Sequence, residues 1–562
     1  TVNPIKEPVQ ITAKAGTWDS NSASYLGCSV FVDQSKIPKL NDHQDSHEQF
    51  LGKSRKELKK LAREGCWSGS HSLRAKAYQH IIQDIPCRLM TPDAFVYQDV
   101  ASKLFGNQSE SFDPLPEFLS GSIMPAYCLT PEGITALKKI LTCISSLYPE
   151  ITYCPLLPAV TALVLHYSQD EAQCFELTCR LLYSKAPHTT YIDQSFLAHE
   201  ASCMTFGDLA NKHCPAAHQL IASLSDIFEV YSEWLVWLFD DLPFNYVIRI
   251  FDVYLLEGQK QYRLFMTSRG QEVVDIKGSL QAFLWDIQEY LVADKLLEKA
   301  FGIRLFSRKE IWLLQMANRK ALVDKGVTMV HHRQPFHLIV NAHNFSSSIV
   351  KAQEMRIVWS WIPERFSLYP PVLLFSTSEN GYSLQRFYSC CEGYEPTLLL
   401  LKNTLGEVSD LVLNTSKKSG VETLCSCSHL TSIQVHPKME RYEWVVIKKP
   451  EQAKALPCPQ RQRSPSPFSL ESHRTTSSNY LTVPKLETIK YRLSPFLAIR
   501  HFKLPSKTAS MFMSGSQEGI VIGGGGGQAL YIDANLNHGR TEHCETFDNP
   551  PLCQQNFQVQ LL

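Results

Sequence analysis

The sequence predicts a multidomain protein in which an all-α domain is followed by a β-rich domain of the α+β, β-sandwich class. Its 562 residues correspond to two to four domains at roughly 100 to 200 residues each. Up to about residue 325, apolar residues recur at helical spacing, as in Leu280, Leu284, Ile287 and Leu291. Beyond about residue 335, the apolar runs are short and bounded by Gly, Pro, Asn or Ser, which is typical of strands.

The segments follow one another in a definite order. Residues 1–45 are polar and aperiodic, which predicts a disordered N-terminal lead. The helical domain spans residues 46–325, and a linker spans residues 326–350. The β-rich domain spans residues 351–562 and contains a Pro-, Ser- and Thr-rich stretch at residues 450–490, which we interpret as a flexible insert.

Composition limits the classes of function. Lysine and arginine together number 55, as do aspartate and glutamate, so the global charge gives no sign of a nucleic-acid partner. The odd count of 17 cysteines fits free thiols in a reducing compartment better than a disulfide framework. The sequence shows neither an apolar stretch of about 18 residues nor an N-terminal signal pattern. A cytoplasmic protein that binds no nucleic acid is therefore expected.

One segment, Lys53 to Arg63, concentrates positive charge, with six basic residues and one acidic residue, Glu57. If this segment is a helix, four of the bases share one face, because they stand at positions i, i+3, i+4 and i+7. These bases are Lys56, Lys59, Lys60 and Arg63. Two interpretations remain open, a solvated helix face and an anion-binding surface.

Landmarks in the two halves resemble two known domains. The first half resembles a TBC domain, the helical Rab GTPase-activating module, through Gly65-Cys66-Trp67, Ile81 to Pro86, Tyr153-Cys154-Pro155 and Arg249 to Val253. The second half resembles a TLDc domain through Leu373 to Ser376, Gly381 to Leu384, Tyr442-Glu443-Trp444 and Gly523 to Asp533. Together they resemble the TBC–TLDc family of neuronal vesicle-trafficking proteins.

The resemblance also identifies where TBC domains carry their catalytic residues. GTPase activation requires an arginine finger and a side-chain amide that orients the attacking water. The positions that match them hold Cys87 and Pro155, and Arg88 stands one residue after the first. In an extended segment that shift points Arg88 to the opposite face. We therefore expect no catalytic residue, and a TBC fold that is silent or very weak as an activator.

The resemblance implies a binding role for the same domain. It implies that a phosphoinositide headgroup is held in a cationic pocket, at positions matching Arg63, Lys260 and Arg263. Lys260 and Arg263 stand three residues apart, so on a helix both reach one phosphate, Arg as a bidentate fork and Lys as a point charge. The implied partners are a small GTPase of the Rab or Arf family and a phosphoinositide membrane surface. The implied location is peripheral, on vesicle or plasma membrane, at the presynapse.

The second half offers no catalytic constellation. For TLDc domains the resemblance implies oxidative-stress resistance and, as a further partner, the vacuolar proton pump. Gly523 to Gly527 is not followed by Gly-Lys-Ser/Thr, so it predicts a turn before a strand rather than a phosphate loop. Cys425, Cys427 and His429 lack the Cys-x-x-Cys spacing of zinc sites. No metal and no cofactor are expected.

Three hypotheses about function follow. The leading one is a membrane-recruited regulator of synaptic vesicle and endosomal trafficking that binds small GTPases and phosphoinositides without intrinsic catalysis. The first alternative is a catalytically active Rab GTPase-activating protein that uses Arg88, and Cys87 and Pro155 argue against it. The second alternative is an oxidative-stress sensor that acts through its thiols.

Overall fold

The computed structural model divides the chain into two compact units. The first comprises residues 1–346 and 351–372, and the second comprises residues 347–350 and 373–562. The structure describes residues 9–10, 30–38, 52–87, 92–106, 111–112, 116, 118, 124–184, 190–224, 230–232, 235, 242–258, 287, 292–303, 307–327, 347–350, 355, 360, 362–392, 394, 397–405, 408–413, 432–436, 446–447, 490–491, 500–503, 513–524, 526–546 and 549–562. No helix among these residues is long and apolar enough to span a membrane.

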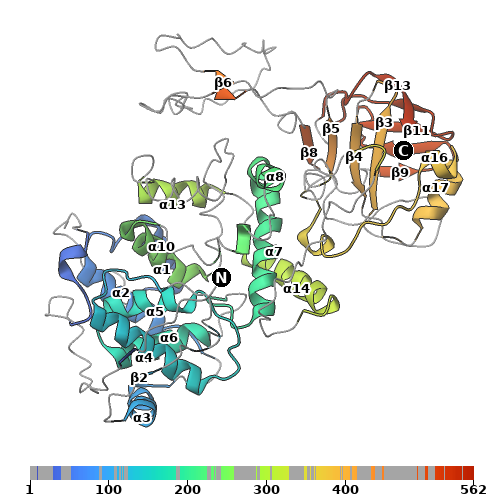
Figure 1. Cartoon of the computed structure of the whole chain (residues 1–562). Helices are drawn as coiled ribbons and strands as arrows, with labels where there is room; N and C mark the ends of the chain where they lie inside the picture. Colours follow the sequence, from blue (N-terminus) through green and yellow to red (C-terminus); the bar gives the residue numbers. More distant parts are fainter. Residues whose placement is uncertain are drawn as a thin grey trace, which may run out of the picture. The chain divides into compact units, whose positions relative to one another are not determined.

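The first unit is helical, as predicted (Figure 1). Its helices of eight or more residues are α1 (Arg55–Glu64), α2 (His71–Gln83), α3 (Ala94–Phe105), α4 (Pro131–Leu147), α5 (Leu157–Ser168), α6 (Glu171–Leu182), α7 (Phe196–His213), α8 (Pro215–Leu224), α10 (Phe244–Glu257), α13 (Ala293–Gly302) and α14 (Arg308–Asp324). Two short 3-10 helices, η1 (Gln34–Lys36) and η6 (Glu364–Phe366), and the antiparallel pair β1 (Val9–Gln10) and β2 (Ser111–Phe112) complete it.

Short polar residues fix where several of these helices begin. Ser54, Thr130 and Asp170 each accept a hydrogen bond from a backbone N–H of the first turn, which satisfies a donor that has no partner inside the helix. Every residue of α5 is buried, and α5 contacts α2, α4 and α6. The helices of the first unit therefore surround a central apolar helix.

A smaller group of helices lies around α7, which contacts α8, α14 and η6 (Figure 1). The segment that carries η6 belongs to the helical unit, although the sequence places the start of the second domain at residue 351. Contacts with α7 explain this, because the backbone N–H of Glu364 donates to Asp208 Oδ1 at 2.9 Å. The carboxylate of Glu364 also occupies the space beside Gly207.

Part of the predicted disordered lead is ordered, which corrects that prediction. In residues 30–38, Val32 is buried and forms an antiparallel bridge with Leu129. Thr130 donates its backbone N–H to Phe31 O at 2.9 Å, and Asp33 donates to Cys128 O at 2.8 Å. Two apolar residues that dock on the core are enough to order the segment, and so short a run has no detectable periodicity.

The second unit is α+β, as predicted. Its strands are β3 (Thr397–Asn403), β4 (Val408–Leu413), β5 (Ser432–His436), β6 (Val446–Ile447), β7 (Lys490–Tyr491), β8 (Arg500–Lys503), β9 (Met513–Gly515), β10 (Gly519–Ile522), β11 (Leu530–Asp533), β12 (His538–Arg540) and β13 (Asn556–Leu561). Nine of them form one antiparallel sheet in the order β8-β5-β4-β3-β13-β12-β11-β10-β9, and β6 pairs with β7.

The central strand β3 and the strands near the β9 edge of this sheet contribute to one apolar core. Leu399 and Leu401 of β3 pack in the same cluster as Ile520 of β10 and Ile532 of β11. The helices α16 (Thr377–Asn380) and α17 (Leu384–Cys391) lie beside the sheet (Figure 1). Strands β3, β10, β11 and β13 therefore share one apolar core. The predicted insert at residues 450–490 lies outside the described residues, except for Lys490.

Candidate functional site

The candidate site forms where the last turn of α1 meets the C-terminal end of α10. A capping box between Ser54 and Glu57 starts α1, and Gly65 ends it in the left-handed conformation at φ 77°. Leu58 and Ala62 are buried, and α1 contacts α10. This packing turns the cationic residues of α1 toward solvent and toward the end of α10, so the predicted helix and its stripe are both present.

Three guanidinium groups converge on the end of α10. Arg63 donates to the carboxylate of Glu257, with its Nε 2.6 Å from Oε1. Arg308 donates to Leu256 O at 2.7 Å. Arg55 donates to Leu255 O at 3.4 Å and to the hydroxyl of Tyr191 at 2.5 Å. Helix C-termini expose carbonyl oxygens and carry negative partial charge, so cations are stabilised there.

The charges at this end of α10 do not balance. Within the described part of the chain, Glu257 is the one carboxylate that forms a salt bridge with any of these three guanidiniums. Its side chain is 3% exposed, whereas that of Arg63 is 37% exposed and lies over the Phe301 ring at 4.3 Å. Burial lowers the pKa of Arg308, and the nearby charge of Glu257 opposes that shift. The site therefore combines one buried negative charge with three positive charges.

Arg249 of α10 fixes the position of α1 relative to this site. Its guanidinium donates to Ala62 O at 2.6 Å and to Arg63 O at 2.8 Å, which caps two carbonyls at the end of α1. The same group pairs with Asp294 at 2.6 Å and with Asp252 at 3.5 Å. Arg249 is 3% exposed, so removal of its side chain leaves buried acceptors without donors.

Asp252 is the centre of a buried network built from the sequence landmarks. It accepts hydrogen bonds from Trp67 Nε1 at 3.0 Å, Arg74 Nε at 2.8 Å and the Tyr78 hydroxyl at 2.8 Å. Burial lowers the pKa of Arg74, but Asp252, through its charge and its hydrogen bond, together with Tyr167 and Tyr78 outweighs burial, and the pKa lies well above the usual range. The motif residues that identify the domain therefore hold α2 against α10.

The other predicted cationic residues fall into two groups. On α1, Lys56 and Lys60 are exposed, and Lys60 pairs with Glu64 at 3.7 Å. Lys59 is half-buried and is also engaged in an interaction with a neighbouring group. Lys260 and Arg263 lie outside the described residues. The structure thus places Arg63 beside Arg55 and Arg308, two residues that the sequence did not single out.

Cys87 occupies a structural position. It forms an isolated bridge with Ser184, and its thiol lies 3.4 Å from Ile85 O and 3.7 Å from Arg180 O. Burial raises the pKa of this thiol, so it stays protonated at neutral pH. Arg180 is held by Glu176 at 3.4 Å and by Gln83 O at 3.0 Å. Arg88 lies outside the described residues.

Pro155 is buried in the turn that precedes α5. Next to it, Cys154 is fully buried, and the ring of Tyr153 packs edge-on against Phe196 and His199 of α7. Proline offers neither a donor nor an acceptor side chain. The two positions matched to the fingers therefore present a neutral thiol and a buried ring.

In the second unit, the glycine-rich segment is a turn between strands, as predicted. Ile522 ends β10 and Leu530 begins β11, and the two strands pair. Gly523 and Gly526 have φ values of +80° and +86°, which L side chains rarely adopt. Cys425, Cys427 and His429, for which the sequence predicts no zinc site, lie outside the described residues, as do His331 and His332.

Comparisons with known proteins match both units. A model of the Rab-GTPase-TBC domain matches residues 71–268, and a model of the TLDc domain matches residues 343–453 and 482–562. TBC1 domain family member 24 of Xenopus tropicalis is 50% identical over 523 residues, which cover 90% of this chain and 91% of that protein. The GTPase-activating protein skywalker of Drosophila melanogaster is 26% identical over 579 residues, with 94% and 90% coverage.

A crystal structure of the TBC domain of Drosophila melanogaster Skywalker in complex with inositol(1,4,5)triphosphate is also similar. It is 24% identical, has a TM-score of 0.41, and covers 48% of this chain and 99% of that chain. The family models and the Xenopus relative confirm the predicted pairing of the two domains. Because this identity extends over nine-tenths of both proteins, the chain belongs to the family of TBC1 domain family member 24, in which a Rab-GTPase-TBC domain is followed by a TLDc domain.

Proposed function

We propose that the chain is a membrane-recruited regulator of synaptic vesicle and endosomal trafficking. Its TBC domain binds a small GTPase of the Rab or Arf family and a phosphoinositide headgroup, and its TLDc domain binds a second partner. The observation that carries the proposal is the excess of positive charge at the end of α10. There, Arg55, Arg63 and Arg308 bind acceptors in the last turn of α10, and among the described residues Glu257 is the one carboxylate that forms a salt bridge with any of them.

The headgroup site extends this cluster with Lys260 and Arg263. Lys260 follows Gly258, the last described residue after α10, by only two positions. A phosphate accepts hydrogen bonds from a guanidinium fork and from an ammonium together. The relationship in sequence to the Drosophila protein, whose TBC domain was crystallised with inositol(1,4,5)triphosphate, supports the same class of ligand.

Magnitudes favour a shaped pocket over a simple cationic face. A basic residue near an anionic membrane contributes about 1 kcal/mol, so the four stripe residues together give about 4 kcal/mol, which corresponds to millimolar affinity. The exposed Lys56 and Lys60 are in a position to add this general attraction. Selective recruitment requires the more strongly ordered guanidiniums beside Glu257, because convergent hydrogen bonds distinguish a headgroup from a charged surface.

Flotation with liposomes tests the site directly. Full-length protein is mixed with vesicles that contain phosphatidylinositol bisphosphate, or an equal charge of phosphatidylserine. The triple variant Arg63→Ala, Lys260→Ala, Arg263→Ala should lose the preference for the phosphoinositide. A matched triple variant, Lys103→Ala, Arg319→Ala, Lys320→Ala, removes the same charge from exposed positions and should keep it. Equal binding by both variants contradicts the pocket.

The proposal includes a TBC domain without intrinsic catalysis. An arginine finger accelerates GTP hydrolysis by about 10³ to 10⁵, or roughly 4 to 7 kcal/mol of barrier. Cys87 and Pro155 supply no comparable charge, and Arg180 beside Cys87 is engaged by Glu176. Single-turnover GTP hydrolysis across a panel of Rab proteins should show little acceleration. Strong acceleration that disappears with Arg88→Ala supports the alternative of an active GTPase-activating protein.

For the TLDc domain, we propose partner binding, with the vacuolar proton pump as the first candidate, and a role in oxidative-stress resistance. Two half-buried thiols argue against the alternative of thiol-based sensing. Burial raises the pKa of Cys391 in the second unit to about 11 and that of Cys128 in the helical unit to about 11, so neither thiol ionises readily at neutral pH. Co-purification of assembled proton pump with the full chain, and its loss after deletion of residues 373–562, tests the partner.

A further inference from the structure

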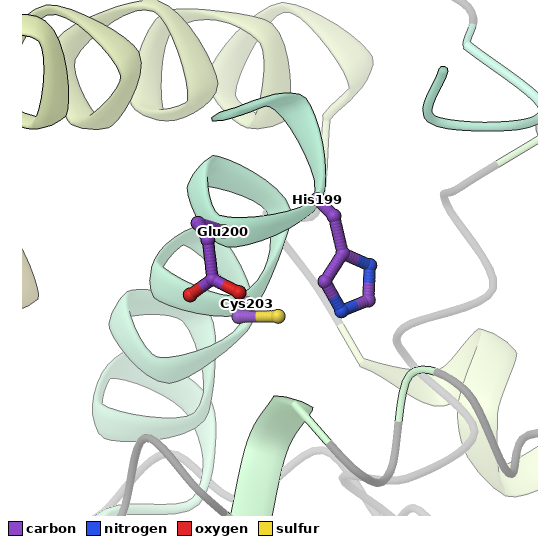
Figure 2. A group of neighbouring side chains, drawn as sticks. All are labelled: His199, Glu200 and Cys203. Carbon is purple, nitrogen blue, oxygen red and sulfur yellow. The ribbon is translucent and has the colours of Figure 1, made fainter. Parts of the chain in front are cut away.

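Three side chains with different metal-binding atoms meet on one face of α7. They are His199, Glu200 and Cys203, and their ligand atoms all lie within 4.8 Å of one another. Their exposed fractions are 4%, 4% and 0%. In Figure 2 the sulfur of Cys203 lies between the carboxylate of Glu200 and the imidazole of His199. One buried point is therefore surrounded by a nitrogen, an oxygen and a sulfur.

Helix geometry brings these atoms together. Residues at i and i+4, and at i and i+3, lie one turn apart on the same face, so His199 and Glu200 both lie next to Cys203. Ser195 caps the start of α7 by accepting from the backbone N–H of Ala198, which fixes the first turn. The two residues that follow this turn are thus held on a rigid element, as a preorganised site requires.

The charges around the trio are acidic. Among the described residues, Glu200 makes no hydrogen bond or salt bridge, although its side chain is only 4% exposed. Its carboxyl therefore lies beside the thiol of Cys203 in a buried position. A buried carboxylate and thiolate repel each other and are unstable without a cation. A bound divalent cation removes both costs by favouring the ionised ligands.

We propose that His199, Glu200 and Cys203 bind one divalent metal ion of the zinc class. Imidazole, carboxylate and thiolate are the ligands that Zn²⁺ takes in proteins, and the combination of nitrogen and sulfur excludes the hard cations Mg²⁺ and Ca²⁺. Three protein ligands leave one tetrahedral position for water or a fourth side chain. Nothing in the sequence resemblance assigns this site, and the inference does not depend on the proposed headgroup pocket.

The site has a structural consequence for the neighbouring segment. The ring of Tyr153 packs against His199 with centroids 5.1 Å apart, and Thr152 donates its backbone N–H to Gln194 O at 3.1 Å. Pro155, at the position of the glutamine finger, follows two residues after Tyr153. A metal ion bound by His199 therefore fixes the part of α7 against which Tyr153, and with it the segment that leads to Pro155, packs.

Metal content and a cobalt spectrum test the proposal on the full chain. Protein purified without chelator is assayed for zinc by mass spectrometry, stripped with chelator, and titrated with Co²⁺. Wild-type protein should hold one zinc per chain, and Co²⁺ should give a thiolate-to-cobalt absorption band. Cys203→Ser should abolish the band. Cys143→Ser, which alters an equally buried thiol on α4, should leave it intact.

A second variant separates metal binding from folding. Glu200→Gln keeps the size of the side chain and removes a buried ionisable carboxyl, so the metal-free form should melt at the same or a higher temperature. Zn²⁺ should raise the melting temperature of stripped wild-type protein and should raise that of Glu200→Gln much less. The proposal is overturned if purified protein lacks stoichiometric zinc and gives no cobalt band, or if Glu200→Gln responds to Zn²⁺ as wild type does.

Discussion

Glu257→Gln should strengthen phosphoinositide binding while it weakens the protein slightly. Glu257 is buried at 3% exposure and accepts hydrogen bonds from Arg63, which is 37% exposed. A headgroup phosphate that binds Arg63 from the solvent side meets the negative charge of Glu257 behind it. Glutamine keeps the shape of the side chain and removes that charge, so Arg63 becomes fully available to the ligand.

The size of the effect follows from Coulomb's law. A phosphate on one side of a guanidinium and a carboxylate on the other are about 6 Å apart, which gives about 3 kcal/mol of repulsion per charge at an effective dielectric constant of about 20. Physiological salt reduces this by roughly half, to about 1.5 kcal/mol, or about tenfold in affinity. The lost pair costs no more than about 1 kcal/mol of stability, because water reaches Arg63.

The assay is a flotation titration with phosphatidylinositol bisphosphate, beside a thermal melt of the same samples. Glu64→Gln is the matched control, because it removes one negative charge from the residue that follows Arg63 on α1, where Glu64 pairs with exposed Lys60 at 3.7 Å. Only Glu257→Gln should bind more tightly. If both variants gain affinity equally, the effect reflects only the net charge of the protein. If a folded Glu257→Gln variant gains no affinity, Arg63 is refuted as a headgroup ligand.

Three further predictions concern stability. Arg249→Met breaks a buried ion pair and the cap of α1, so urea unfolding should show a loss of about 3 to 5 kcal/mol. Gly523→Ala places a Cβ 2.6 Å from Cys544 Sγ at positive φ, whereas at Gly526 the nearest atom is 3.8 Å away. The first change should therefore destabilise more than Gly526→Ala, which carries only about 1 to 2 kcal/mol of backbone strain. Burial lowers the pKa of His166 from 6.5 to about 3 in the folded protein. Below pH 6.5 the imidazole is therefore protonated in the unfolded chain but stays neutral in the folded one, which favours unfolding. Stability should fall by about 2 kcal/mol between pH 7 and 5, and in urea titrations His166→Gln should flatten that slope.

Much of the fold was predictable because long, periodic segments carry strong signals. The change from helical spacing to short apolar runs correctly separated an all-α unit from an α+β unit. Local signals also placed α1, where the pattern from Lys53 to Arg63 gives a helix with Leu58 and Ala62 on its buried face. Residues 30–38 were mispredicted because two docked side chains, Phe31 and Val32, produce no period.

The candidate site was only partly predictable. Arg63 stood out because it lies in a dense basic segment, but its partner Glu257 is 194 positions away in the sequence. Arg55 and Arg308 donate to backbone carbonyls of α10. Because every residue has a carbonyl, the sequence does not show which one serves as the acceptor. No pattern of side chains marks such a partner, so these two residues are identified only by the hydrogen bonds that they make to the end of α10 in the folded chain.

The proposed metal-binding trio has a signal in the sequence. His199, Glu200 and Cys203 form His-Glu-x-x-Cys, a helical spacing that places ligands one turn apart. The sequence has no Cys-x-x-Cys pair, and that pattern alone predicts no metal site. A helix supplies ligands at i, i+1 and i+4 without any such pair, and burial of all three then distinguishes a candidate site from a solvated surface.

In the proposed headgroup site, the guanidiniums at the end of α10 also keep the charge of Glu257 compensated. Removal of a charged partner from a buried carboxylate costs several kcal/mol. Here Arg308 already feels the charge of Glu257 and is tied to the adjacent carbonyl of Leu256. When a phosphate draws Arg63 outward, the buried carboxylate keeps a positive neighbour. Binding therefore replaces the ion pair between Arg63 and Glu257 with one between Arg63 and the phosphate. The packing of α1 on α10 is largely preserved, so little of the binding free energy is lost in disrupting it.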